Sequence, residues 1–143
     1  MNIYALVVGI VIAAFVVWRF KSRRWEKTKW AYPFLLATFP AYYWVFAVYA
    51  SDYTALVNEF VAGLAFLTIA YIAYRFKSQA TLLLLAVGYV GHATYDVYHD
   101  LFFVNSGAPT WWPEFCGAVD VLVGIYIGYL AFSLRKRKQA AIA

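Results

Sequence analysis

The segment from residue 91 to 100 holds the side chains best suited to chemistry. It places two histidines and an aspartate, His92, Asp96 and His99, within one predicted helix. At about 100° per residue, Asp96 lies about 40° from His92, and His99 lies about 20° from it on the other side. The three side chains therefore share an arc of about 60° on one helix face. Two imidazoles and a carboxylate on one face could converge on a common centre, such as a divalent metal ion.

Two further acids lie at matching depths in other predicted helices. At 1.5 Å per residue, Asp96, Asp120 and Glu59 lie about 8 to 10 Å below the outer ends of their helices. We expect these acids to meet at one level, with His92 deeper and His99 nearer the outer surface. The sequence therefore predicts a metal site whose ligands are His92, Asp96, His99, Asp120 and Glu59. The three acids, Asp96, Asp120 and Glu59, are also the candidate catalytic residues. Because His92 and His99 lie about 10 Å apart along the helix, either one could instead pair with Asp96 alone.

The remaining outer acids and the single cysteine fit other roles. Asp52, Asp100 and Glu114 lie close to the predicted outer ends of their helices, so we interpret them as the rim of the site. Cys116, the only cysteine, excludes an intrachain disulfide and a zinc cage built from cysteines. We interpret it as a small packing residue, buried and unpaired. A structural alternative applies to the whole set, because an intramembrane Asp or His can also hydrogen-bond a neighbouring helix.

The chain around these residues has the composition of a membrane protein. Of its 143 residues, 65% are hydrophobic and 13% are charged, about half the charged fraction of a typical soluble domain. Five apolar runs are each long enough to cross about 30 Å of hydrocarbon. We therefore predict a single all-α domain, residues 1–143, that is an integral membrane bundle with transmembrane helices over approximately 2–19, 31–50, 54–75, 79–103 and 113–134.

Lys and Arg residues occur in three clusters that predict the orientation of the bundle. The clusters lie at 19–29, 75–77 and 135–138, each beside an apolar run. With five spans all three fall on one side, which the positive-inside rule makes cytoplasmic. The N-terminus then lies outside and the C-terminus in the cytoplasm, in a multi-pass protein of the inner (plasma) membrane. Membrane anchoring is thus a better interpretation of the +5 net charge than nucleic-acid binding. We expect residues 139–143 to be disordered.

Small and aromatic residues predict how the helices pack. Gly117, Gly124 and Gly128 form a stripe beside Asp120 that should let a second helix approach closely. The loop over 105–113 should cap the fifth helix, with a lid over the site as the alternative. Aromatic side chains gather on the outer halves of the second and fourth predicted helices, where they could line a lipophilic pocket or simply pack: Tyr42, Tyr43, Trp44, Tyr49, Tyr95 and Tyr98.

Two short strings of residues resemble those of small bacterial multipass membrane proteins. They read His92-Ala93-x-x-Asp96-x-x-His99 and Trp112-Pro113-x-Phe115-Cys116-x-x-x-Asp120. The resemblance covers the fourth and fifth predicted helices, under a third of the chain, and implies no activity. The layout is also similar to that of sterol-isomerase-like membrane proteins, which place acid and His groups in an aromatic-lined cavity between helices. No motif match carries their catalytic residues over.

Three functions compete for this pattern. Two histidines with several carboxylates suit zinc or non-haem iron, so the first is a metal-dependent enzyme acting on a lipid or other lipophilic small molecule. The second is a metal-free acid–base enzyme such as an isomerase, in which carboxylates and histidines shuttle a proton. The third is a cation or proton conductor, or a metal-binding accessory to transport, in which an acidic outer mouth attracts cations and a homo-oligomer completes the path. We favour the first.

Overall fold

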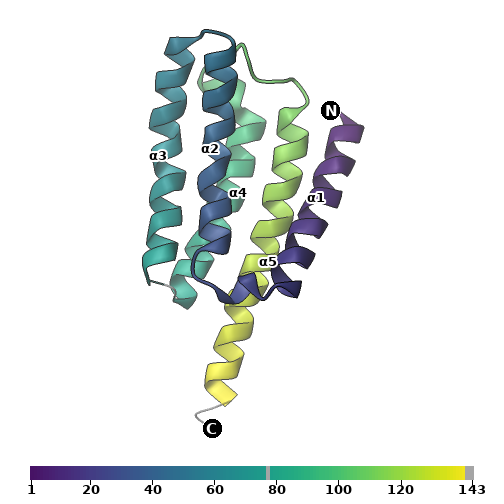
Figure 1. Cartoon of the computed structure of the whole chain (residues 1–143), viewed down its shortest axis with the longest axis vertical. Helices are drawn as coiled ribbons and strands as arrows, with labels where there is room; N and C mark the ends of the chain where they lie inside the picture. Colours follow the sequence, from purple (N-terminus) through teal and green to yellow (C-terminus); the bar gives the residue numbers. More distant parts are fainter. Residues whose placement is uncertain (77, 141–143) are drawn as a thin grey trace.

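The computed structural model describes residues 1–76 and 78–140, with side chains up to residue 133. These residues form five long helices and a short 3-10 helix, η1; the elements are α1 (Ile3–Ser22), η1 (Trp25–Lys27), α2 (Ala31–Tyr49), α3 (Tyr53–Phe76), α4 (Gln79–Phe102) and α5 (Trp112–Ala140). The long helices run alternately up and down (Figure 1). All five are long and apolar enough to cross a membrane. The predicted all-α fold with five helices of membrane-spanning length is therefore confirmed.

Polar residues at the helix starts explain where the apolar runs become helical. The side chain of Asn2 accepts a hydrogen bond, 3.1 Å long, from the backbone N–H three residues later and so begins α1. Asp52, predicted as a rim residue, caps α3 in the same way at 2.9 Å. A capping box between Ser78 and Thr81 begins α4. Each cap satisfies a backbone N–H that has no partner within its helix.

α5 continues past the predicted end of its span. The sequence predicts a helix to residue 134, whereas α5 ends at Ala140, and the part of it that could cross a membrane ends at Ser133. The expectation of disorder is therefore wrong for residues 139 and 140, while residues 141–143 lie outside the described part of the chain. The physical reason is that Arg, Lys, Gln and Ala all favour helix, and a helix can continue from lipid into water.

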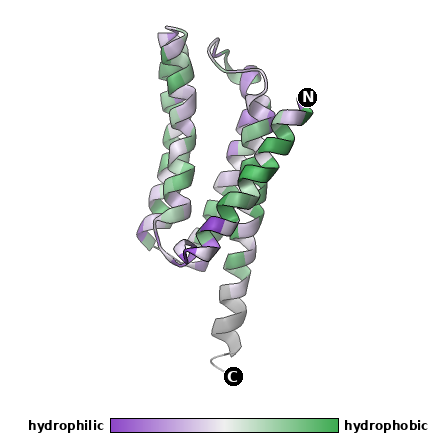
Figure 2. Ribbon diagram, turned by 45° about the vertical axis from the view of Figure 1, so that its right-hand side comes forward, coloured by the Kyte–Doolittle hydropathy of each residue, from purple (hydrophilic) through white to green (hydrophobic). Residues whose placement is uncertain are grey.

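The described basic residues lie at the end of the bundle from which α5 emerges. The first basic cluster surrounds the turn from α1 through η1 to α2, and Arg75 lies in the last turn of α3. Figure 2 shows hydrophilic residues around η1 and mostly hydrophobic ones along the helix that rises from it to the N-terminus. Lys77 lies outside the described residues. The predicted orientation requires such a grouping at one end.

An apolar core fills the part of the bundle nearer the basic end. Leu36 of α2, Leu85 of α4, and Val123 and Ile127 of α5 are fully buried there. Many large apolar side chains on the outward faces of the helices are exposed, which suits a surface that faces lipid. The buried acids and histidines lie beyond this core, towards the end of the bundle opposite the basic residues, and we call that part of the bundle the outer half.

α1 is held to the bundle mainly through α5. Their closest approach is at Gly9, where an added Cβ would lie 2.4 Å from the backbone oxygen of Phe115 and 2.9 Å from the Cβ of Ala118. α5 also packs against α4, and α2 packs against α3. α5 therefore lies between α1 and α4, which positions its residues to share a site with α4.

The predicted glycine stripe on α5 is only partly used for packing. An added Cβ on Gly124 would lie 3.1 Å from the Cβ of Tyr89 in α4. At Gly117 and Gly128 it would meet no atom of a neighbouring helix within 4 Å, so the prediction is wrong for these two positions. Two helices that cross at an angle are closest only near the crossing point, and a glycine is needed only there.

Gly9→Ala should weaken the packing of α1 on α5. The new methyl group would overlap a backbone oxygen that cannot rotate away, and overpacking of this kind costs about 1 to 3 kcal/mol. Gly128→Ala is the matched control, because its methyl group meets open space and alanine gains about 1 kcal/mol of helix propensity over glycine. Thermal unfolding in detergent should show a lower Tm for Gly9→Ala and an unchanged or higher Tm for Gly128→Ala. Equal shifts in both variants would contradict this account of the interface.

Candidate metal centre

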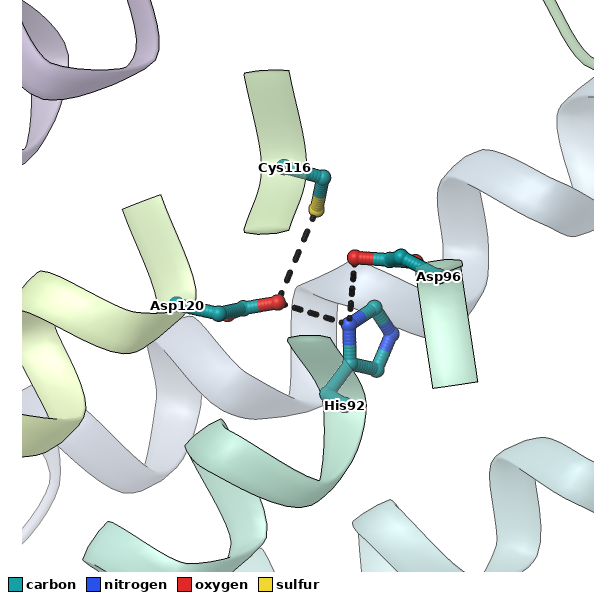
Figure 3. Close-up of side chains that lie close together, drawn as sticks. All are labelled: His92, Asp96, Cys116 and Asp120. Carbon is teal, nitrogen blue, oxygen red and sulfur yellow. Dashed lines mark hydrogen bonds and ion pairs between the residues drawn. The ribbon is translucent and has the colours of Figure 1, made fainter. Parts of the chain in front are cut away.

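Four side chains from α4 and α5 converge in the outer half of the bundle. His92 and Asp96 come from α4, and Cys116 and Asp120 come from α5 (Figure 3). Each pair is four residues apart, so each helix presents both of its residues on one face. One potential ligand atom from each residue lies within 4.8 Å of all the others, and all four residues are buried. These four residues, which we call the metal cluster, could hold a metal ion.

The imidazole of His92 lies between the two carboxylates. Its Nδ1 is 2.8 Å from Asp120 Oδ2 and 3.3 Å from Asp96 Oδ2. The thiol of Cys116 points toward the same Asp120 Oδ2 atom, with Sγ 3.8 Å away (Figure 3). One Nδ1 hydrogen can serve only one carboxylate well, so His92 alone does not satisfy both acids.

Two carboxylate oxygens of the cluster lack a hydrogen-bond partner among the described residues. They are Asp96 Oδ2 and Asp120 Oδ1, both fully buried. A buried carboxylate without a compensating partner is costly, and a bound cation is one way to remove that cost. These unpartnered oxygens are therefore the feature of the cluster that points to a cation.

The donor set and its spacing fit a transition metal. Bonds of about 2.0 to 2.3 Å around a tetrahedral zinc separate neighbouring ligand atoms by about 3.3 to 3.8 Å. The distances from His92 Nδ1 to Asp96 Oδ2, 3.3 Å, and from Cys116 Sγ to Asp120 Oδ2, 3.8 Å, fall in this range. The 2.8 Å contact between His92 and Asp120 needs to open by about half an ångström, and the more distant of the four ligand atoms, which lie within 4.8 Å of one another, need to close on the ion. A thiolate and an imidazole favour zinc or iron over magnesium or calcium.

Aromatic side chains enclose the metal cluster and orient its ligands. Phe66 packs edge-on against the ring of His92, with centroids 4.7 Å apart, and Phe39 packs on it at 5.3 Å. The hydroxyl of Tyr43 donates a 2.8 Å hydrogen bond to Asp96 Oδ1. This contact fixes one oxygen of Asp96 and leaves the other facing His92, as an outer-shell partner of a metal ligand would.

A second buried network lies closer to the outer end of α4 and centres on Glu59. Glu59 Oε1 accepts hydrogen bonds from Asn105 Nδ2 and pairs with His99 Nε2, both at 2.8 Å, and its Oε2 accepts the hydroxyl of Tyr95 at 2.7 Å. The other nitrogen of His99 lies 3.2 Å from Asp100, whose side chain is 88% exposed. Both oxygens of Glu59 are partnered, so this network, the Glu59 network, needs no cation.

The predicted site residues therefore divide between two centres. His92, Asp96 and Asp120 come together as predicted, whereas His99 and Glu59 belong to the Glu59 network. A single centre made by all five residues does not form, because Glu59 and His99 bond each other and lie outside the group of four potential ligands. The physical reason is that different neighbours face the two ends of the His92–His99 stripe: α5 faces its inner end and α3 its outer end.

Cys116 takes part in the site as well as in packing. It is buried and free, as predicted, and it packs with Tyr43 and Trp112, but it also belongs to the metal cluster. The sequence signal for its place in the cluster is the spacing of four residues between Cys116 and Asp120, which puts both side chains on one helix face, as it does for His92 and Asp96. Glu114, a predicted rim residue, accepts a 2.9 Å hydrogen bond from the backbone N–H of Asn2.

Tyr43 and Asn105 connect the two centres; the sequence suggests Tyr43 only as a possible pocket-lining residue and Asn105 only as part of a cap or lid. Tyr43 donates to Asp96, and its ring stacks on His99 with centroids 4.7 Å apart and planes 12° apart. Asn105, from the loop after α4, donates to the carbonyl of Tyr43 as well as to Glu59. The loop thus contributes to the outer network instead of only capping α5.

No family model, curated protein or solved structure matches the chain. The resemblance to small bacterial multipass proteins stays an expectation, and the function must be argued from the geometry of the site.

Proposed function

We propose that the chain is an integral membrane metalloenzyme whose metal cluster holds one divalent ion, zinc or iron, and acts on a lipid or other lipophilic molecule. The observation that carries the proposal is a buried four-residue donor set in which two carboxylate oxygens lack a hydrogen-bond partner among the described residues. In a bundle of this hydropathy, such a cluster lies at a depth where lipophilic substrates, rather than polar ones, reach it.

Within the cluster, the contacts suggest different roles for the two aspartates. Asp120 Oδ2 faces both His92 and Cys116, so His92, Cys116 and Asp120 form the natural ligand set. Asp96 is held by Tyr43 through one oxygen, which leaves its Oδ2 free to act as a fourth ligand or as a base. A zinc ion held by these residues would supply an activated water molecule as the nucleophile. Asp96 would then accept its proton.

Elemental analysis of the purified protein tests the proposal. We expect roughly one zinc or iron per chain, and a higher Tm when the matching metal is added to stripped protein, because a ligand that binds only the folded state stabilises it. Protein that holds no stoichiometric metal, and gains no stability from zinc, iron or manganese, would contradict the proposal.

A metal-free acid–base site is the second candidate, and one contact favours it. The 2.8 Å distance between His92 Nδ1 and Asp120 Oδ2 already suits a hydrogen bond without a metal. A proton shared among His92, Asp96 and Asp120 could then move to and from a substrate, as an isomerase requires. The elemental analysis separates the two candidates.

The proposal places the N-terminus outside the inner (plasma) membrane and the C-terminus in the cytoplasm. Its support is the grouping of the basic residues beside the end from which α5 emerges. A phosphatase reporter, which is active only outside, should be inactive when fused to the C-terminus and active when fused in the loop at residues 106–108. The reverse pattern would overturn the orientation and would place the cluster on the cytoplasmic side.

Tyr43→Phe should weaken metal binding without removing it. The substitution takes away the hydroxyl that holds Asp96, and loss of an outer-shell partner lowers metal affinity by about 10- to 100-fold. Tyr42→Phe is the control, because that half-exposed ring packs on Trp112 and not on the cluster. Competition with a chelator of known affinity measures both. Equal affinities in the two variants would show that Tyr43 does not orient a ligand.

A further inference from the structure

A long groove lies between α1, α2 and α5 and follows most of the length of α1. It encloses about 650 Å³, a volume typical of ligand sites. The groove exists because α1 packs against α5 and has little contact with α2. We call it the α1/α2/α5 groove; its lining includes Val8, Ile12, Leu35, Phe39, Cys116 and Val119.

The shape and chemistry of this groove suit a single hydrocarbon chain. Its lining on α1 runs from Asn2 to Val16, which spans about 21 Å of helix. No charged side chain lines it among the residues that the structure describes, and its few polar groups include Asn2 and the half-exposed Tyr42 and Trp111. Tyr and Trp are typical of the membrane–water interface. The groove is therefore suited to an apolar chain whose polar end stays at the outer rim.

The groove also touches the metal cluster. Cys116 lines the groove and belongs to the cluster. Phe39 lines the groove and packs on the imidazole of His92 at 5.3 Å between ring centroids. A molecule in the groove therefore contacts the wall of the cluster directly.

A second groove on the other side of α1 provides a comparison. It lies between α1, α4 and α5, encloses about 590 Å³, and is also lined mainly by apolar residues, among them Val97 and Val121. Its lining includes the carboxyl residue Glu114 and no member of the metal cluster. The two grooves have similar size and apolar character and differ in their access to the cluster.

We propose that the α1/α2/α5 groove binds the acyl chain of a membrane lipid and lays it against Cys116 at the wall of the metal cluster. The assignment of this lipid as the substrate rests on the proposed function, whereas the binding of the chain does not. The proposal narrows the substrate class to lipids with a linear acyl chain that enter from the outer leaflet.

Photo-crosslinking tests the proposal. The full chain is reconstituted in phosphatidylcholine vesicles that contain phosphatidylcholine with a diazirine on one acyl chain, and the crosslinked peptides are mapped by mass spectrometry. We expect crosslinks concentrated on groove residues, including Val8, Phe39 and Cys116. Crosslinks spread over all lipid-facing helices in proportion to exposure, with the second groove labelled equally, would overturn the proposal.

Groove-filling variants provide the matched comparison. Val8→Trp fills the α1/α2/α5 groove, and Val121→Trp fills the second groove. The yield of crosslinks on the Cys116 peptide should fall by at least about fivefold in Val8→Trp, since bulk in a groove excludes the chain, and should be unchanged in Val121→Trp. Ile12→Phe should reproduce the loss if Val8→Trp does not fold. Unchanged crosslinking in a folded groove-filling variant would overturn the proposal.

The same samples separate this proposal from the proposed function. Neither Val8 nor Val121 belongs to the metal cluster, so metal content should be equal in the wild type and the folded variants. Enriched crosslinking in protein without metal would support the lipid groove and contradict the metalloenzyme. Stoichiometric metal without enriched crosslinking would support the metal site and contradict the lipid groove.

Discussion

His92→Gln should abolish stoichiometric metal binding, and His99→Gln should leave it intact. Nδ1 of His92 is the atom that faces both carboxylates of the cluster, at 2.8 and 3.3 Å. His99 instead pairs with Glu59 in the outer network. Loss of a direct ligand should lower affinity by more than the about 100-fold that the loss of an outer-shell partner can cost. Both substitutions replace histidine with glutamine, so a difference in metal binding between the two variants reports which histidine is the ligand.

The metal content of the two variants, measured per folded protein, checks this expectation. A further sign of the same chemistry is that the wild type should release metal on acidification, because imidazole and thiol must be deprotonated to bind. Equal loss of metal in His92→Gln and His99→Gln would mean that metal binding depends equally on both histidines, and would contradict the assignment of His92 alone as a ligand.

Glu59→Ala should cause the largest loss of stability among single substitutions in the outer half. Glu59 is 2% exposed and is the shared acceptor for His99, Tyr95 and Asn105. Its removal leaves those donors without their partner and separates α3 from α4 and the following loop. Breaking a buried ion pair by removing one partner costs about 3 to 5 kcal/mol.

Unfolding in detergent, followed by tryptophan fluorescence, measures this loss. Asp100→Ala is the control, because Asp100 also contacts His99 but its side chain is 88% exposed, and exposed pairs contribute little. The folded fraction of Glu59→Ala should keep its metal, since the metal cluster does not include Glu59. A stable Glu59→Ala protein that lacks metal would instead make Glu59 a ligand and not a structural residue.

The fold was predictable because the main signal for it, hydropathy, is an average over long segments of the chain. Hydropathy predicts five runs of sufficient length, and in the structure two of these helices begin at the polar residues Asn2 and Ser78. The end of α5 was not predictable from hydropathy, since a helix that leaves the apolar run can continue through residues that favour helix, as it does to Ala140.

The candidate site was predictable only in part because a sequence gives the direction of a side chain around its own helix but not the neighbour it meets. The shared face of His92 and Asp96 follows from their spacing. The separation of His99 from them depends on α3 facing the outer end of α4, through Glu59, and on α5 facing the inner end, through Asp120. No periodicity within one segment carries that information.

X-ray absorption at the zinc edge of the purified, zinc-loaded protein tests the central claim most directly. The account predicts one zinc per chain with a sulfur ligand at about 2.3 Å and nitrogen or oxygen ligands at about 2.0 to 2.1 Å. The sulfur contribution should disappear in Cys116→Ser, and the imidazole contribution should disappear in His92→Gln. A first shell of oxygens alone, or a spectrum unchanged by both substitutions, would contradict the metal centre and leave the acid–base site as the function of this cluster.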